Sequence, residues 1–169
     1  MTSNLMLSEL CSFADGRVAV IDLDSSTYIS TENMLPNKDG VTGSSKLPTV
    51  SQVQAYQMDD VLVSNIRPYF RKIWFADRDG GCSNDVLVLR AKQNCNPCFL
   101  YYLLSNDGFF DYVTATAKGT KMPRGDKGAI MQYEVPGFSL EVQAKISEIL
   151  SSLDAQIVIN KTINHHLAA

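Results

Sequence analysis

Residues 117–127, AKGTKMPRGDK, gather four positive side chains around two glycines and a proline. Opposed by Asp126 alone, they leave a local net charge of +3 in a chain whose formal net charge is -3. Lysine and arginine neutralise phosphates, arginine also grips guanine in a major groove, and glycine permits close backbone approach. The stretch is not a P-loop, because it lacks the G-x-x-x-x-G-K-[ST] order and follows no strand. It indicates a phosphate-binding loop, with a solvated surface loop as the alternative. The cations are Lys118, Lys121, Arg124 and Lys127.

A second cationic stretch, IRPYFRKIWFADR at 66–78, interleaves basic and aromatic side chains. Such interleaving suits a nucleic-acid surface, because bases stack on aromatic rings while cations meet phosphates. Strand alternation, however, places Lys72 and Trp74 on one side and Arg71 on the other. We therefore expect Tyr69, Phe70 and Trp74 to pack within the sheet. The cations of this stretch are Arg67, Arg71, Lys72 and Arg78, opposed by Asp77.

Cys95 and Cys98 have the C-x-x-C spacing of a metal or redox site. A structural zinc needs four ligands, and no second pair with matching spacing accompanies this one. We expect two small buried or half-buried thiols and no bound metal. The other candidate ligands are Cys11, Cys82, His165 and His166.

Enzyme chemistry has little support in the sequence. Both histidines are adjacent and near the end of the chain, so a Ser-His-Asp or Cys-His site would require the last helix to fold back. The segment NPCF at 96–99 is similar to the Asn-Pro-Pro-Phe loop by which adenine methyltransferases hold a flipped base, but no Gly-rich cofactor loop accompanies it. Asp77, Asp79 and Asp85 are the candidate metal ligands of a nuclease. We expect no catalytic residue. A stand-alone adenine methyltransferase or metal-dependent nuclease is the alternative.

The bulk composition is that of one globular domain. The chain has 169 residues, of which 45% are hydrophobic and 20% charged, enough to bury a core. It contains no apolar run long enough to cross a membrane and no signal peptide, so we expect a cytoplasmic protein. An acidic chain is repelled by nucleic acid at long range, so any contact with DNA must be local and oriented.

Two kinds of periodicity predict a mixed α/β fold of the α+β type. Alternating β-branched residues predict strands at 16–22, 60–66, 71–76 and 86–91, with a turn at 77–81 and the last three strands in a meander. Helices are predicted at 7–13 and at 97–113, the second interrupted near Gly108, and 132–136 returns to strand character. Residues 25–58 are expected to form turns and short extended pieces. The resulting sheet is expected to be mixed and twisted.

The longest expected element begins after Ser139, a good N-cap, and continues to the end of the chain without glycine or proline. Apolar and asparagine residues at steps of four and three form a heptad seam, typical of a coiled coil. We expect this helix to project and pair with another helix. A helix lying on its own domain is the alternative. The expected division is 1–138 and 139–169. The seam consists of Ile146, Leu150, Leu153, Ile157, Asn160, Asn164 and Leu167.

The succession of these segments resembles one half of the specificity subunit of type I restriction-modification enzymes. The resemblance covers nearly the whole chain and includes DVLVSNIRPYFRKIWFA, GGCSNDVLVLRA, FLYYLLSNDGFFDYV, AKGTKMPRGDKGAI, YEVPGF and the last helix. It implies a target-recognition domain at 1–138 that reads one half of a split DNA sequence, and a helix that sets the spacing between halves. It implies no cofactor in this chain, with S-adenosylmethionine, ATP and Mg confined to partner subunits.

The resemblance also implies partners and DNA contacts. The partners are double-stranded DNA, methyltransferase (modification) subunits, the restriction subunit through the complex, and a second half-unit or another copy of the chain through the helix. Lys118, Lys121 and Lys127 are expected on phosphates and Arg124 on a base edge, with Thr120 in the same loop. A protein-interaction module without DNA selectivity is a further alternative. The remaining expected DNA contacts are Asn65, Arg67, Arg71, Lys72, Ser83 and Asn84.

Overall fold

The computed structural model describes residues 4–167, apart from the side chains of 166 and 167. The strands are β1 Asn4–Met6, β2 Cys11–Phe13, β3 Arg17–Ala19, β4 Tyr28–Ile29, β5 Gln52–Tyr56, β6 Val61–Ser64, β7 Ile73–Phe75, β8 Gly80–Cys82, β9 Val86–Ala91 and β10 Glu134–Pro136. The helices are α1 Leu7–Leu10, α2 Pro97–Leu104, α3 Asp107–Ala115, α4 Lys127–Met131 and α5 Leu140–Leu167, with single 3-10 turns at η1 Val20–Asp22 and η2 Pro68–Phe70.

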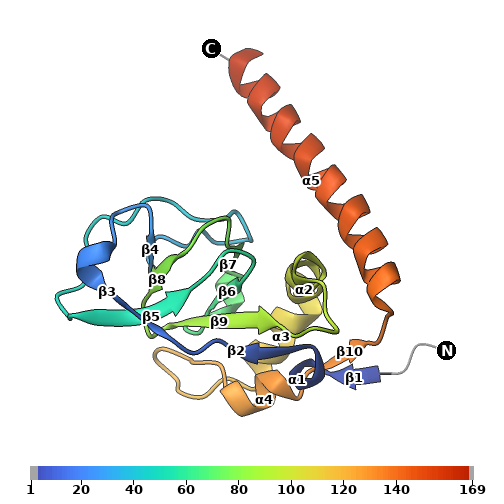
Figure 1. The fold of residues 1–169 in the computed structure, drawn as a ribbon, viewed down its shortest axis with the longest axis horizontal. Coiled ribbons are helices and arrows are strands. Elements are labelled where there is room, and N and C mark those ends of the chain that lie inside the picture. Colours follow the sequence, from blue (N-terminus) through green and yellow to red (C-terminus); the bar gives the residue numbers. More distant parts are fainter. Residues whose placement is uncertain (1–3, 168–169) are drawn as a thin grey trace.

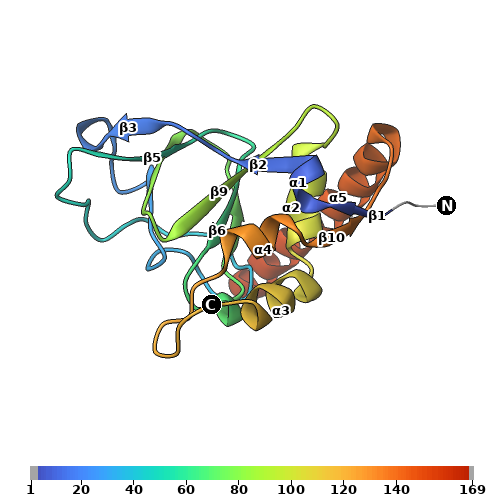
Figure 2. The same cartoon turned by 90° about the horizontal axis from the view of Figure 1, so that it is seen from below.

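Three sheets organise these elements, ordered β2-β9-β6-β7, β3-β5-β8-β4 and β1-β10. The first is the central layer. Helices α1 to α4 cover one of its faces, and the second four-stranded sheet covers the other, as Figures 1 and 2 show. The β4–β8 pair is parallel, while the other strand pairs of these sheets are antiparallel. The expected mixed α/β fold class is therefore confirmed.

β6 and β9 form the middle of the central sheet, because both are apolar runs buried on both faces. Their register pairs Val61 with Leu89 and Leu62 with Val88. Alternate pairs serve different cores: the first pair faces the helices, and the second faces the other sheet. The predicted meander is wrong, because β9 pairs with β6 rather than with β7.

One strand of the second sheet was not predicted. β8 overlaps the predicted turn at 77–81, whereas β4 and β5 fall among the turns and short extended pieces expected at 25–58. Glycine suits β8 because a Cβ on Gly81 would come within 2.6 Å of a Val53 methyl and 2.7 Å of a Leu23 methyl. The predicted strand at 16–22 is confirmed only for β3, since η1 follows it.

The predicted strand at 71–76 is shortened to β7, so its first two residues lie outside the sheet. Trp74 packs between the two sheets, 8% exposed, with its ring edge-on to Tyr56 at a centroid distance of 5.7 Å. Tyr69 and Phe70 do not pack within the sheet. They lie in η2 and are 50% and 41% exposed, so for these two the expectation is wrong.

Side-chain caps divide the helical region. Asn96 accepts a hydrogen bond from the Phe99 amide at 3.0 Å, and Asn106 accepts one from the Gly108 amide at 2.7 Å. The second cap starts α3 afresh, so the predicted interruption is confirmed and falls at Ser105 and Asn106. The predicted helix at 7–13 is confirmed only for α1, because Cys11 joins β2 and pairs with β9.

α5 is the long predicted helix, and it projects away from the body (Figure 1). Its first turn is fixed by Gln143, which is 1% exposed and accepts a hydrogen bond from the Asn96 amide at 2.8 Å. The same side chain donates to the Phe138 carbonyl at 2.9 Å and to the Asn94 carbonyl at 3.1 Å. With 28 residues α5 is about 42 Å long. Within the described range, no helix is both long enough and apolar enough to cross a membrane.

Candidate nucleic-acid interface

Three separate segments meet where β6 ends and β9 begins. The Asn65 amide donates to the Asp85 carbonyl at 2.8 Å, which joins the end of β6 to the turn before β9. The Gly125 amide donates to the Asn65 carbonyl at 3.0 Å, and the Arg67 amide donates to the Pro123 carbonyl at 2.8 Å. These bonds tie the basic loop, which joins α3 to α4 and extends beyond the ends of both helices (Figure 2), to the same strand end. We call this surface the strand-end face, made of segments 65–72, 83–85 and 118–127.

The basic loop is a small hairpin rather than an irregular excursion. Lys118 and Arg124 exchange two backbone hydrogen bonds, of 2.8 and 2.9 Å, which close its base. Gly119 has a φ of +95°, a conformation that favours glycine. Thr120 and Lys121 lie exposed at the tip. The loop therefore holds its cations on a backbone anchored to the sheet.

Segment 65–72 contains two arginines in the left-handed region. Arg67 has a φ of 49° and Arg71 a φ of 52°, which costs about 1 kcal/mol or more for each residue. Tertiary hydrogen bonds enforce this geometry: the amides of Asn37 and Lys38 donate to the Phe70 and Arg71 carbonyls at 2.9 and 2.8 Å. The result is a rigid turn that presents Arg67 beside the basic loop.

Most cations of the strand-end face have partners. Arg124 Nη2 lies 2.9 Å from Asp85 Oδ1, and Lys118 pairs with Asp126. Lys118, and after it the Ala129 amide, lower the pKa of the Asp126 carboxyl.

Arg71 faces α3, where its guanidinium lies 3.0 Å from an Asp107 oxygen and 3.6 Å from an Asp111 oxygen. Lys72 Nζ donates to the Thr31 carbonyl at 2.6 Å, and its burial lowers its pKa. Lys127 Nζ lies 5.4 Å from the centre of the Phe13 ring.

Across residues 4–165, Arg67 and Lys121 differ from the other cations of this face in their lack of partners. Among the described residues, the exposed side chains of Arg67 and Lys121 have no hydrogen-bond, ion-pair or aromatic-ring partner, whereas Lys127 has its ring contact. A cation without an internal partner is available to an anion from outside. Backbone hydrogen bonds bring the segments of these two residues together. The partners of the other cations were not predicted: three have carboxylates, one has a backbone carbonyl and one has an aromatic ring.

Three predicted polar contacts have distinct positions. Ser83 is half-buried and Asn84 is exposed, both in the turn before β9. Asn65 lies beneath the surface: its Oδ1 is buried and has no hydrogen-bond partner within the described part of the chain. Gly125 packs directly over it, since a Cβ there would lie 2.9 Å from that oxygen. Asn65 therefore supports the basic loop from beneath.

A neighbouring part of this surface was not predicted from the sequence. Thr31 and Glu32 join Arg67, Phe70 and Met122 around a hollow of about 290 Å³. The polar, aperiodic stretch 25–58 gave no signal for it. Asn33, 5% exposed, holds part of this stretch together through its side chain. It donates to the Thr42 carbonyl at 2.8 Å and accepts from the Ser30 amide at 2.6 Å.

The candidate metal and nuclease residues do not converge. Across the described residues, no group of three or more histidines, cysteines or acidic residues is placed to hold a metal ion. Asp77 pairs with Arg78, and Asp79 accepts a hydrogen bond from the Met58 amide at 2.8 Å. Burial raises the pKa of the Cys95 thiol to about 11 and those of Cys11 and Cys82 to about 12. The side chain of His166 lies outside the described residues.

The heptad seam of α5 is half-buried only at its start. Ile146 packs on the helical core and Leu150 is half-buried, while Leu153 and Ile157 are each 51% exposed. Asn160 and Asn164 are exposed too, and the Leu167 side chain lies outside the described residues.

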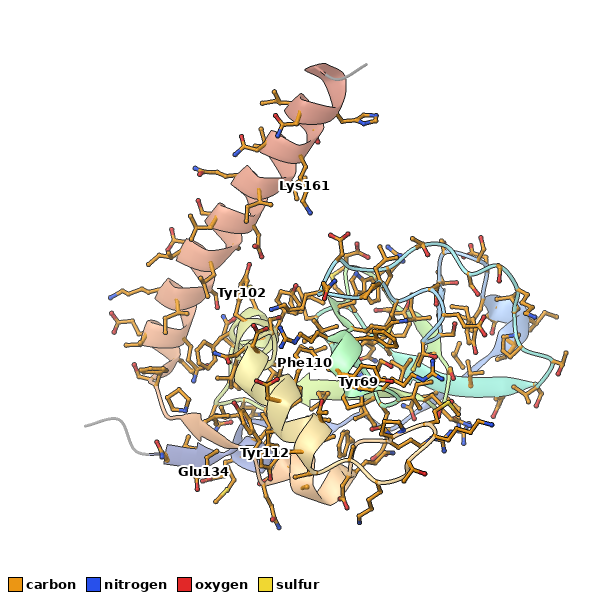
Figure 3. The ribbon with its side chains drawn as sticks, turned by 180° about the vertical axis from the view of Figure 1, so that it is seen from behind. Tyr69, Tyr102, Phe110, Tyr112, Glu134 and Lys161 are labelled. Atoms are coloured by element: carbon orange, nitrogen blue, oxygen red, sulfur yellow. The ribbon has the colours of Figure 1, made fainter. Side chains whose placement is uncertain are left out.

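Polar contacts from another side of α5 hold it near the domain. Tyr102 donates to Asp154 at 2.8 Å, and Lys161 lies 3.3 Å from Asp39. Figure 3 shows Tyr102 and Lys161 in the space between α5 and the body. The apolar seam is uncovered from Leu153 to Asn164, so the alternative of a helix lying on its own domain is wrong for that part of α5.

Comparisons with known proteins agree on one family. The profile of the type I restriction modification DNA specificity domain matches residues 25–169. The specificity subunit of the Escherichia coli type I restriction enzyme EcoDI is 27% identical over 132 residues, 78% of this chain and 28% of that protein.

Solved structures share the fold. The HsdS subunit from Thermoanaerobacter tengcongensis superposes with a TM-score of 0.74 at 21% identity, covering 95% of this chain and 44% of that one. A chain from a study of complex assembly and conformational transition of the type I R-M system gives a TM-score of 0.73 at 23% identity, with coverage of 95% and 44%. The chain thus spans less than half the length of the relatives it matches. It belongs to the type I restriction modification DNA specificity domain family.

Proposed function

We propose that this chain reads one half of a bipartite DNA target for a type I restriction-modification complex. The observation that carries the proposal is the strand-end face. It brings together, on anchored backbone, Arg67 and Lys121, whose side chains have no partner among the residues that the structure describes. Phosphates bind such side chains, while base edges require positioned donors such as Arg124. In this proposal residues 1–138 recognise DNA, and 139–169 provide spacing and subunit contacts.

The proposal assigns no reaction to this chain. Methylation with S-adenosylmethionine and cleavage with ATP and Mg belong to the modification and restriction subunits, which this chain directs to a sequence in the cytoplasm. The supporting observation is chemical: the candidate carboxylates Asp77, Asp79 and Asp85 are each held by other partners. A stand-alone methyltransferase or nuclease has no comparable support.

The uncovered seam of α5 is proposed to pair with a second helix, from another copy or from a second half-unit, and to contribute to docking of the modification subunits. Leu153 and Ile157 are each 51% exposed although apolar, and a heptad stripe of this kind is buried in helix pairs. The asparagines Asn160 and Asn164 would fix register and partner choice.

Selection from random duplexes tests the DNA-reading proposal. The full chain is incubated at low salt with a random duplex pool, and retained molecules are sequenced over several rounds. We expect a short shared sequence to be enriched by the wild type and by Arg17→Ala, which removes an exposed arginine on β3, away from the strand-end face (Figure 2). Arg67→Ala should bind the same sequence more weakly. Retained duplexes with the composition of the input pool would refute sequence recognition.

Light scattering tests the helix proposal. The wild-type chain should have the mass of a dimer, and Leu153→Asp should reduce it to a monomer, because a charge in the seam is desolvated on pairing. Val158→Asp is the matched control, since Val158 is 62% exposed but lies off the seam. Equal masses for wild type and Leu153→Asp would count against pairing through this stripe.

A further inference from the structure

Asp85 occupies a fixed place on the strand-end face. Its amide donates to Ser83 Oγ at 3.2 Å, and its carbonyl accepts from the Asn65 amide at 2.8 Å. Both bonds involve the backbone, so the direction of the carboxylate is set by the turn that leads into β9. The side chain is 34% exposed and lies at the cationic surface rather than in the core.

Arg124 is fixed from the other side. Its amide and carbonyl both bond to Lys118, at 2.9 and 2.8 Å, and isolated bridges align it with Ile66 as well. From this anchored backbone its side chain, 54% exposed, reaches Asp85 with Nη2 at 2.9 Å from Oδ1. Within the described residues the guanidinium has no second partner, so most of its N–H donors stay free.

A guanidinium offers five N–H donors in a rigid fork. Guanine presents two acceptors, O6 and N7, in the major groove, and recognition requires two donors of the fork to be aimed at them together. A carboxylate that holds one edge of the fork orients the others before DNA arrives, which reduces the ordering cost of binding. We propose that Asp85 is a positioning residue that aims Arg124 at a guanine. This inference rests on the proposed DNA-reading function.

The charge of Asp85 supports a role in selectivity rather than in general affinity. A carboxylate on a phosphate-facing surface repels the DNA backbone, so it weakens binding to every sequence alike. Within the described part of the chain the side chains of Arg67 and Lys121 have no partner, so both are available to phosphates. Asp85 thus lowers the affinity for DNA of any sequence, while Arg124, which it orients, favours one base pair.

Selection and competition binding test this assignment on the full chain. The variants are Asp85→Ala, Asp85→Asn, Arg124→Ala and the double variant of Asp85→Ala with Arg124→Ala. Asp22→Ala is the control, because it removes an exposed carboxylate from η1 in another part of the fold. We expect Asp85→Ala to lower the preference for guanine at one base pair by about tenfold, with unselective binding unchanged or tighter. Asp85→Asn keeps an acceptor oxygen and should retain most of the preference.

The double variant separates positioning from a general structural effect. If Asp85 acts through Arg124, Asp85→Ala causes no further loss of preference once Arg124→Ala is present. A loss spread over all positions of the site, or a further loss in the double variant, would overturn the inference. So would an unchanged guanine preference in Asp85→Ala. A wild-type chain that enriches no sequence refutes the proposed function itself, so the two failures are distinguishable.

Discussion

The two ends of the β6–β9 strand pair each carry one arginine–aspartate pair, and the pairs differ in geometry. At one end Arg90 donates through Nε and Nη2 to both oxygens of Asp60, at 2.8 and 2.7 Å, and the Asp60 side chain is 2% exposed. This bond raises the pKa of Arg90. At the other end Arg124 uses one nitrogen, and Asp85 is 34% exposed.

The difference shows how identical residue types serve different purposes. The Gln57 amide also donates to Asp60, at 2.8 Å, so that carboxylate is fully used in holding the sheet end together. A carboxylate that is buried and already bonded in this way offers nothing to a ligand, and removing it leaves Arg90, 37% exposed, without its partner. The open pair keeps free donors at the surface. We therefore propose that the end with Asp60 and Arg90, the closed end, serves stability, and that the end with Asp85 and Arg124, the open end, serves recognition.

The largest predicted effect is at the closed end. Asp60→Ala should lower the free energy of unfolding by about 2–3 kcal/mol, because Arg90 and the Gln57 amide lose their acceptors. Urea denaturation measures the change. Asp85→Ala is the matched variant at the open end and should shift stability by less than about 1 kcal/mol, the usual range for an exposed pair. Equal losses of unfolding free energy in Asp60→Ala and Asp85→Ala would contradict the proposed difference between the two ends.

The next effect is at the open end and concerns binding. Arg124→Ala should cost about 1–3 kcal/mol of discrimination at one base pair of the selected duplex while leaving the urea midpoint nearly unchanged. Competition binding with single base-pair changes measures it. If Arg124→Ala discriminates at every base pair as well as the wild type does, another part of the domain must read the bases.

A smaller effect concerns pH at the base of the basic loop. Lys118 lowers the pKa of Asp126, so the pair stabilises the fold above the unfolded pKa of about 3.9 and loses this contribution as pH falls through the folded value. Lys118→Met should therefore be slightly less stable than the wild type at pH 7, and the difference should shrink below about pH 4. Urea midpoints across this range measure it. A difference that grows on acidification would have the wrong sign.

The smallest effect is at the tip of the loop. Lys121→Ala removes one unpartnered cation and should lower the slope of log K against log salt by about 0.9, the release of one counterion from duplex DNA. Lys145→Ala, on α5, is the control and should leave the slope unchanged. An unaltered slope for Lys121→Ala would remove this residue from the phosphate contacts.

Much of the scaffold followed from local pattern. β6 and β9 are uninterrupted apolar runs, the helix break follows from the cap at Asn106, and α5 follows from a long segment without glycine or proline. β8 was missed because its stability comes from tertiary packing. Gly81 in particular is chosen for its lack of a side chain against Val53, which no periodicity reveals.

The candidate site was predictable in part. Charge clustering placed Arg67 and Lys121 on one surface, and that convergence agrees with the backbone bonds between their segments. The partners of the other cations were not predictable, because Asp85 is 39 residues from Arg124 along the chain. Ion pairs over such separations depend on which strands are neighbours, and the predicted meander had the strand order wrong.

The most direct test asks which surface touches DNA. A photocrosslinker is attached at Thr120→Cys, at the tip of the basic loop, and in a second protein at Ile21→Cys, where the native side chain is 91% exposed on η1. The half-buried Cys98 is replaced by serine in both. With the selected duplex bound, the Thr120→Cys protein should form a covalent protein–DNA band and the Ile21→Cys protein should not. Bound duplex that crosslinks only from position 21, or equally from both positions, would contradict the assignment of the strand-end face to DNA.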